Sequence, residues 1–161
     1  MRAHHVEADK TPLEREFAVR WYDGWLEAWN ANKPEMVYDL LTEDFVLDSP
    51  TTRHTSWTVR GQDAAADYIR YVLAAYPDLE WTVAAAPMFT DDLARAAFSW
   101  TGTGHFSGKM DPPGVQGNGQ AFEFSGLEVF DFRGDRACYL YASYDLLGLM
   151  KQIGLYRGAT A

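Results

Sequence analysis

The chain has little cysteine, little positive charge and no long apolar run. Cys138 is the only cysteine among 161 residues, which rules out an intramolecular disulfide and makes a reducing cytoplasm the expected compartment. The 23 acidic residues outnumber the 14 basic ones, and the formal charge of −9 would repel the phosphates of nucleic acid and of anionic membranes. No apolar run approaches the length of a membrane span, and the polar stretch 1–10 does not resemble a signal peptide. We therefore expect neither nucleic acid nor a membrane among the partners of this chain.

Aromatic side chains are what the chain has in abundance. Six Trp, nine Tyr and nine Phe make up 15% of the residues, in a chain whose hydrophobic fraction is 47%. Rings in this number can fill a core, or line a pocket that holds a flat apolar ligand. The length suits a single domain, which we expect at residues 11–157 between a flexible tail at 1–10 and a C-terminal tail at 158–161.

Three helices are predicted in the first half of the chain. Residues 11–14, Thr-Pro-Leu-Glu, combine a capping residue, a proline at the first helical position and a glutamate three residues after the cap. The helix should run to about Asn30, because apolar residues recur at four-residue steps, at Leu13, Phe17, Trp21, Trp25 and Trp29. A short second helix is expected from 32 to 41, and a third from 61 to 76, where a proline follows.

Strand patterns dominate the second half. After an isolated strand at 45–48 and a polar loop at 51–60, strands are expected near 79–89, 93–106, 120–132 and 137–145. Short sequences that tolerate positive φ separate them, at 91–92, 117–119 and 133–135. Helices first and long strands after is the order of an α+β fold. We predict a strongly curved antiparallel sheet wrapped around the three N-terminal helices, forming a cone-shaped barrel with an internal pocket.

A carboxylate at the end of the last predicted strand is the first candidate for catalysis. On period-two alternation, Tyr139, Tyr141, Ser143 and Asp145 point to one face. A carboxylate that shares a face with aromatic rings is poorly hydrated, so we expect the pKa of Asp145 to rise toward neutrality, as suits a general acid and base. The alternative is an ordinary aspartate at the end of a strand, exposed to water or capping the next segment.

Several stretches of the second half, in their order, carry a family resemblance. They are Tyr-Pro-Asp-Leu at 76–79, Trp-Thr-Gly-Thr-Gly-His-Phe-Ser-Gly at 100–108, Pro-Pro-Gly at 112–114, Phe-Glu-Phe-Ser-Gly at 122–126, and the closing Leu-Met-Lys-Gln-Ile-Gly at 149–154. Over residues 12–155 the chain resembles the SnoaL-like polyketide cyclases, in the cone-shaped superfamily of scytalone dehydratase, ketosteroid isomerase and limonene epoxide hydrolase. The resemblance implies a homodimer and chemistry without a cofactor. A homodimer is also expected because we place rings such as Phe98 and Trp100 on the outer face of the sheet, and large exposed apolar patches are usually covered.

The resemblance also assigns roles to individual residues. Asp145 matches the catalytic acid and base of the family, and His105 matches a histidine that lines the same cavity. Asp48 falls where the family often has a polar cavity residue on its first strand. The chain departs from the family pattern at Gly104, which reads as an insertion before His105, and at Tyr139 and Tyr141, where the family has glutamate and tryptophan.

Aromatic residues complete the set of substrate-binding candidates. In a cone fold the first helix forms one wall of the pocket, so we expect Trp21 or Trp25 to contact ligand, although their spacing also suits core positions. Trp57 lies in the predicted loop over the mouth, as a lid residue or as a surface ring. Tyr141 shares the face of Asp145 and could bond substrate through its hydroxyl.

Metal and cofactor chemistry find no support in the residue patterns. The four histidines show no ligand spacing, so we expect no metal, and the glycines at 102, 104 and 108 do not match a dinucleotide fingerprint. The leading hypothesis is a cofactor-independent cyclase or isomerase of secondary metabolism that acts on an apolar, ketone-containing substrate through Asp145. The alternatives are an epoxide hydrolase or dehydratase on the same fold, and a small-molecule-binding module without catalysis.

Overall fold

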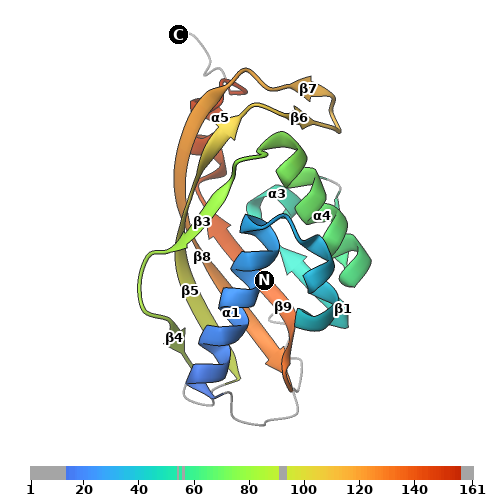
Figure 1. Cartoon of the computed structure of the whole chain (residues 1–161), viewed down its shortest axis with the longest axis vertical. Coiled ribbons are helices and arrows are strands. Elements are labelled where there is room, and N and C mark those ends of the chain that lie inside the picture. Colours follow the sequence, from blue (N-terminus) through green and yellow to red (C-terminus); the bar gives the residue numbers. More distant parts are fainter. Residues whose placement is uncertain (1–13, 54, 56, 91–93, 157–161) are drawn as a thin grey trace.

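A curved sheet with helices against its concave side makes up the molecule (Figure 1). The computed structural model describes residues 14–53, 55, 57–90 and 94–156. The two expected tails, at 1–10 and 158–161, and the expected helix cap at Thr11 lie outside these residues. The predicted α+β class and the curved sheet are confirmed.

The predicted helices are present, and two more accompany them. The described residues form α1 (Arg15–Asn30), a 3-10 turn (Pro34–Met36), α2 (Val37–Leu40), α3 (Pro50–Arg53), α4 (Gln62–Ala75) and α5 (Leu146–Gln152). The expectation of a polar loop throughout 51–60 was wrong, because α3 opens at Pro50, whose ring suits a first helical position, and Val59 starts a short strand. The closing helix α5 follows Asp145 directly.

The strands form one large sheet and a small hairpin. They are β1 (Leu41–Asp48), β2 (Val59–Arg60), β3 (Glu80–Val83), β4 (Met88–Phe89), β5 (Arg95–Phe106), β6 (Lys109–Met110), β7 (Val115–Gln116), β8 (Gln120–Arg133) and β9 (Arg136–Tyr144). The large sheet has the order β2-β1-β9-β8-β5-β3, with β4 also paired to β5. The prediction of an antiparallel sheet was wrong for one pair of strands, because β1 and β9 pair in parallel. These two strands are separated by most of the sequence. The single strand expected at 79–89 is divided into β3 and β4, and the segment 109–116 forms the β6–β7 hairpin.

Alternation along β5 and β8 decides which side chains face the helices. Phe98 and Trp100 are each only 2% exposed and lie in the core, so the expectation that they are rings of the outer face was wrong. A pattern of alternate residues assigns side chains to two faces but does not say which face is covered. Gly126 of β8 makes room for one of these rings, because a Cβ atom there would lie 2.4 Å from the Trp100 indole.

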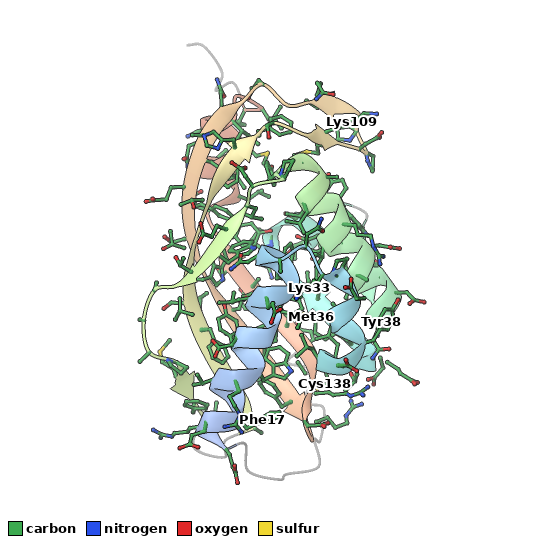
Figure 2. All side chains as sticks on the ribbon, in the orientation of Figure 1. Phe17, Lys33, Met36, Tyr38, Lys109 and Cys138 are labelled. Atoms are coloured by element: carbon green, nitrogen blue, oxygen red, sulfur yellow. The ribbon has the colours of Figure 1, made fainter. Side chains whose placement is uncertain are left out.

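The two ends of the concave side are filled differently. At the lower end in the view, Phe17 of α1 packs edge-on against Phe132 of β8, with ring centroids 6.3 Å apart (Figure 2). Trp21 adds edge-on contacts to Phe130 and Phe132, so this end is solid. At the other end the β6–β7 hairpin lies beside α4, and the Tyr71 hydroxyl donates to the Pro112 carbonyl at 2.8 Å. Among the described residues, no helix has the length and apolar character needed to cross a membrane.

Candidate functional site

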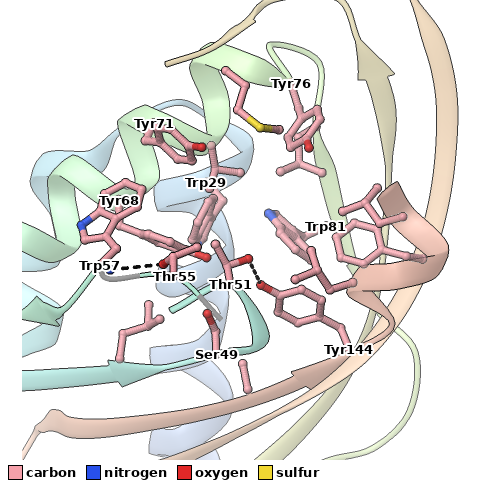
Figure 3. Close-up of a pocket in the computed structure, with 18 of the residues that line it drawn as sticks. Trp29, Ser49, Thr51, Thr55, Trp57, Tyr68, Tyr71, Tyr76, Trp81 and Tyr144 are labelled. Atoms are coloured by element: carbon pink, nitrogen blue, oxygen red, sulfur yellow. Dashed lines mark hydrogen bonds between the residues drawn. The ribbon is translucent and has the colours of Figure 1, made fainter. Parts of the chain in front are cut away.

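A cavity of about 690 Å³ opens between the concave face of the sheet and the helices. Its walls are mainly aromatic and aliphatic, and come from α1, β1, α3, α4, β3, β5, β8, β9, α5 and the β6–β7 hairpin (Figure 3). Tryptophans contribute much of the apolar wall: Trp25, Trp29, Trp57, Trp81 and Trp100. A cavity of this size and character suits a ligand with several rings.

Glu128 is the only acidic or basic residue among the described residues that line the cavity. It lies on β8, between Phe98 of β5 and Ala142 of β9 in the ladder. The side chains of the same face along β8 are otherwise apolar or absent: Phe122, Phe124, Gly126, Phe130 and Phe132. Because side chains alternate along the strand, the Glu128 carboxylate lies on the same face as these aromatic rings.

Among the described residues, all hydrogen-bond partners of the Glu128 carboxylate are uncharged. The Tyr22 hydroxyl donates to it at 2.8 Å, and the Trp25 indole N–H donates to its other oxygen at 3.4 Å. Desolvation raises the pKa of Glu128 from its ordinary value of 4.5 to about 7, although both donors act in the opposite direction. Burial is also the main reason why the pKa of Tyr22 is raised. Glu128 can therefore hold or release a proton near neutral pH, and its accessible surface borders the cavity.

A group of hydroxyls forms a second polar region of the wall. The hydroxyls of Tyr144 and Thr51 lie 2.7 Å apart, and Ser49 and Tyr68 lie on the same side of the cavity (Figure 3). Ser49 is only 2% exposed, and its Oγ accepts from the Thr52 backbone N–H at 3.2 Å. Burial raises the pKa of Tyr68 well above its usual range, so this phenol stays protonated. The cavity thus contains hydroxyl donors and acceptors apart from Glu128.

Of the three predicted tryptophans, two line the cavity and one does not. Trp25 lines it from α1, and Trp57 lines it where its ring packs edge-on against Tyr68 and Tyr71. Trp21 belongs to the core instead, and its indole N–H donates to the Leu40 carbonyl at 3.0 Å. Contact of Trp25 or Trp57 with a ligand stays a prediction.

Asp145 lies outside the cavity. Its side chain is exposed, and its Oδ1 accepts from the Gly148 backbone N–H at 2.8 Å at the start of α5. The expectation of a poorly hydrated carboxylate was wrong. Tyr139, Tyr141 and Ser143 share the outer face of β9, while Leu140, Ala142 and Tyr144 line the cavity. Asp145 follows the last residue of the strand. The geometry of Asp145 is that of a helix cap.

The other polar residues singled out in the sequence also lie on the outer face. His105 is exposed, with its Nδ1 2.6 Å from a carboxylate oxygen of Asp78. Asp48 accepts from Arg53 at 2.7 Å, and Arg53 in turn lies over the ring of Tyr141 at 4.7 Å from its centroid. The structure therefore does not bring His105, Asp48, Tyr141 and Asp145 together in the cavity.

Glu128 is the residue that sequence reasoning missed. It occupies a position of the same parity as four phenylalanines of one predicted strand, and an acid in such a row is a detectable signal. No group of three or more His, Cys, Asp or Glu side chains that could hold a metal occurs within the described ranges.

Comparisons with known proteins agree with this architecture. The profile of the SnoaL-like domain matches residues 22–140. Curated proteins contain no significant match to the chain. Among solved structures, TsrD from Streptomyces laurentii superposes with a TM-score of 0.75 at 21% identity, over 89% of this chain and 99% of its own.

Two further solved structures are described as polyketide cyclases. A SnoaL-like protein from Jannaschia sp. CCS1 has a TM-score of 0.75 at 20% identity, over 92% of this chain and 99% of its own. IdmH from Streptomyces antibioticus has a TM-score of 0.69 at 22% identity, over 84% of this chain and 97% of its own. At such identities the likeness establishes the shared fold.

Proposed function

The chain belongs to the SnoaL-like domain family, and from this premise and the chemistry of its cavity we propose a cofactor-independent cyclase or isomerase. Its substrate is an apolar ketone of the polyketide type, either already polycyclic or a linear precursor whose rings have yet to close. Glu128, rather than the sequence-predicted Asp145, is the acid and base. The observation that carries this proposal is a desolvated carboxylate with a pKa of about 7, alone of its kind among the described lining residues of a large aromatic cavity.

The proposed reaction uses one proton twice. Ionised Glu128 removes a proton from a carbon beside a ketone, and the electrons of the broken C–H bond form an enolate. The enolate carbon attacks a second carbonyl of the same molecule, so that a C–C bond forms and the attacked oxygen becomes an alkoxide. The alkoxide takes the proton back from Glu128, and the product has the mass of the substrate. In an isomerase the same proton returns to a different carbon of the enolate system.

The aromatic walls contribute by excluding water and by holding the substrate. Trp25 and Tyr22 fix the orientation of the carboxylate through their two hydrogen bonds. Tyr22 is itself stacked on Phe98, with ring centroids 3.9 Å apart, which holds its hydroxyl in place. A substrate bound against this wall has its reacting carbon close to the carboxylate before the proton transfer. Holding reacting groups together in this way is a large part of catalysis.

The hydrolase alternative finds fewer of its groups in the cavity. An epoxide hydrolase of the limonene type needs two carboxylates and an arginine around a water. The described lining residues include one carboxylate, Glu128, and no arginine. The non-catalytic binding module requires only the cavity, and the experiment below separates it from the enzyme.

Proton exchange on a simple ketone tests the role of Glu128 without the natural substrate. The protein is incubated with 1-tetralone in D2O, and loss of the α-proton signal is followed by NMR. We expect the wild type to accelerate exchange, and Glu128→Gln to lose about 10²- to 10⁴-fold, the usual contribution of a positioned base. Glu123→Gln is the matched control, since Glu123 is exposed on the opposite face of the same strand.

Asp145→Asn decides between the two candidate acids. Asparagine caps helices about as well as aspartate, so we expect this variant to fold and to retain exchange. Loss of exchange in Asp145→Asn, with full exchange in Glu128→Gln, would reverse the assignment. Saturable binding of the ketone without exchange by the wild type would instead indicate the binding module.

A panel of polyketide esters, cyclic ketones and terpenoid epoxides then identifies the reaction class. Mass spectrometry of the products should show conversion at unchanged mass. A gain or loss of water would support the hydrolase or dehydratase instead.

Assembly and compartment are further parts of the proposal. We propose a homodimer through the outer face of the sheet, where Ala97, Leu127 and Val129 are only partly covered. Sedimentation at micromolar concentration tests it, and a monomer would contradict it. The cytoplasmic location expected from the single cysteine stays a prediction.

A further inference from the structure

We propose that Tyr144, together with Thr51, binds an oxygen substituent at the far end of the substrate from the ketone that meets Glu128. This inference rests on the proposed function, and it narrows the substrate class to a fused-ring ketone with a hydroxyl or carbonyl oxygen at its opposite end. Tyr144 is then a specificity-determining residue. Glu128 performs the proton transfer, and Tyr144 selects which molecules present their ketone to it.

The positions of the two polar regions follow from the register of the sheet. Glu128 of β8 pairs with Ala142 of β9, and Gly126 pairs with Tyr144. Tyr144 is therefore the diagonal neighbour of Glu128 on the same face, with Cβ atoms on the order of 7–8 Å apart. From these positions the Glu128 carboxylate turns to Tyr22 and Trp25 of α1, and the Tyr144 hydroxyl turns to Thr51 of α3. The two polar groups thus lie apart in the wall of one cavity, where a flat bicyclic ligand can meet both.

Tyr144 lies against the aromatic wall and turns its hydroxyl away from it. Gly126 opposite has no side chain, and the ring of Trp100 occupies the space over it. The ring of Tyr144 packs against Trp100 and Phe124, with centroids 5.9 and 5.7 Å apart. Its hydroxyl meets Thr51 of α3, the short helix that follows β1 beside β9 (Figure 3). The polar atoms of this pair thus border the cavity while the ring completes its wall.

The Tyr144–Thr51 pair retains hydrogen-bonding capacity for a ligand. Two hydroxyls have two protons and four acceptor lone pairs, and their mutual bond at 2.7 Å uses one proton and one lone pair. The Tyr68 hydroxyl also interacts with both, and acceptor lone pairs still remain for a ligand. Ser49 and Tyr68, on the same wall, belong to the same buried hydroxyl region. A wholly apolar ligand that filled the cavity would remove water from these groups and replace none of its hydrogen bonds. A ligand oxygen at this place restores one, so the cavity favours oxygenated rings.

Another tyrosine of the cavity provides a matched control. The Tyr71 hydroxyl already donates to the Pro112 carbonyl at 2.8 Å, at the hairpin rather than beside β9. Tyr71→Phe therefore removes one phenolic oxygen from the same cavity without touching the Tyr144–Thr51 pair.

The test compares two ketones that differ by one hydroxyl. Affinities for 1-tetralone and 6-hydroxy-1-tetralone are measured by tryptophan fluorescence or calorimetry for the wild type, Tyr144→Phe, Thr51→Val and Tyr71→Phe. We expect the wild type to bind the hydroxylated ketone roughly fivefold more tightly, the worth of one hydrogen bond. Tyr144→Phe and Thr51→Val should bring this ratio close to one, with 1-tetralone affinity kept within about twofold. Tyr71→Phe should keep the wild-type ratio.

Three results would overturn the proposal. They are a wild type without preference, a preference that survives in both Tyr144→Phe and Thr51→Val, and an equal loss of affinity for both ketones, which would make Tyr144 a wall residue only. The binding ratio is measured without turnover, so it is independent of Glu128. A Glu128→Gln variant that keeps both the ratio and α-proton exchange would reject the proposed function and leave the oxygen subsite standing.

Discussion

The two faces of the central sheet place carboxylates in opposite surroundings. On the concave face, the donors to Glu128 within the described part of the chain are both neutral, and desolvation raises its pKa to about 7. On the convex face, Asp48 is paired with Arg53 at 2.7 Å, while Asp145 is in water and caps α5. Carboxylates of one sheet stand on both faces, so the difference comes from what covers each face. Helices cover one face and remove water from it, and an acid there becomes a chemically useful group.

The aromatic rings of the two faces also have different neighbours. The concave face of β8 has phenylalanines before and after Glu128, whereas the convex face of β9 has the partly exposed tyrosines Tyr139 and Tyr141. Rings on the convex face are stabilised by water and by charged neighbours, as Tyr141 is by Arg53. Rings on the concave face are stabilised by one another. Replacing a ring with alanine should therefore change the free energy of unfolding by different amounts on the two faces.

Among the changes considered, removal of an aromatic ring from the concave face should lower the free energy of unfolding most. Removal of a ring from the convex face should lower it little. Phe130 is 0% exposed and Tyr141 is 38% exposed. We expect Phe130→Ala to lower the free energy of unfolding by about 3–5 kcal/mol, through lost burial and a new cavity. Tyr141→Ala should lower it by less than about 1 kcal/mol. Urea denaturation measures both, and equal losses would contradict the distinction between the faces.

The pH dependence of stability should carry the signature of Glu128. Between its ordinary pKa of 4.5 and its folded pKa of about 7, the folded protein binds a proton that the unfolded chain has released. The free energy of unfolding should therefore fall as the pH rises through this window, by up to roughly 3 kcal/mol, and not fall further from this group above it.

Urea denaturation at several pH values between 4.5 and 8 checks this prediction. Glu128→Gln removes the titrating group, so this component of the slope should disappear and the variant should gain stability relative to the wild type as the pH rises. Glu123→Gln, on the exposed face of the same strand, should follow the wild type. A wild-type slope retained in Glu128→Gln would show that another group titrates.

The smallest effect is expected from the ion pair of the convex face. Asp48 and Arg53 are about a third exposed, at 30% and 33% of their side chains, so water screens their attraction. Asp48→Asn should change the free energy of unfolding by less than about 1 kcal/mol, and should leave α-proton exchange intact. A loss of exchange would return Asp48 to the candidate site and weaken the contrast between the faces.

Much of the fold was predictable from local patterns. The helices at 15–30 and 62–75 and the long strands β5, β8 and β9 follow from spacing and turn residues. The parallel pairing of β1 with β9 was not predictable, because it joins strands that are far apart in the chain. The short helix α3 and the β6–β7 hairpin have too few residues to show a period of their own.

The candidate site was predictable in part. Trp25 and Trp57 line the cavity, but Asp145, His105, Asp48 and Tyr141 lie on the outer face. Alternation correctly assigned Tyr139, Tyr141 and Ser143 to one face of β9, but it did not show that this face is the outer one. Glu128 had a signal of its own in the row of phenylalanines around it.

The sequence by itself determined the class of the protein, an acidic, ring-rich α+β domain, and the assignment of residues to two faces of each strand. It did so because periodicity and turn chemistry are local properties of the chain. Only the tertiary structure decided which face the helices cover, and with it the desolvation of Glu128 and the exposure of Asp145. Burial depends on contacts between distant segments, such as Tyr22 of α1 with Glu128 of β8, and no local pattern contains them.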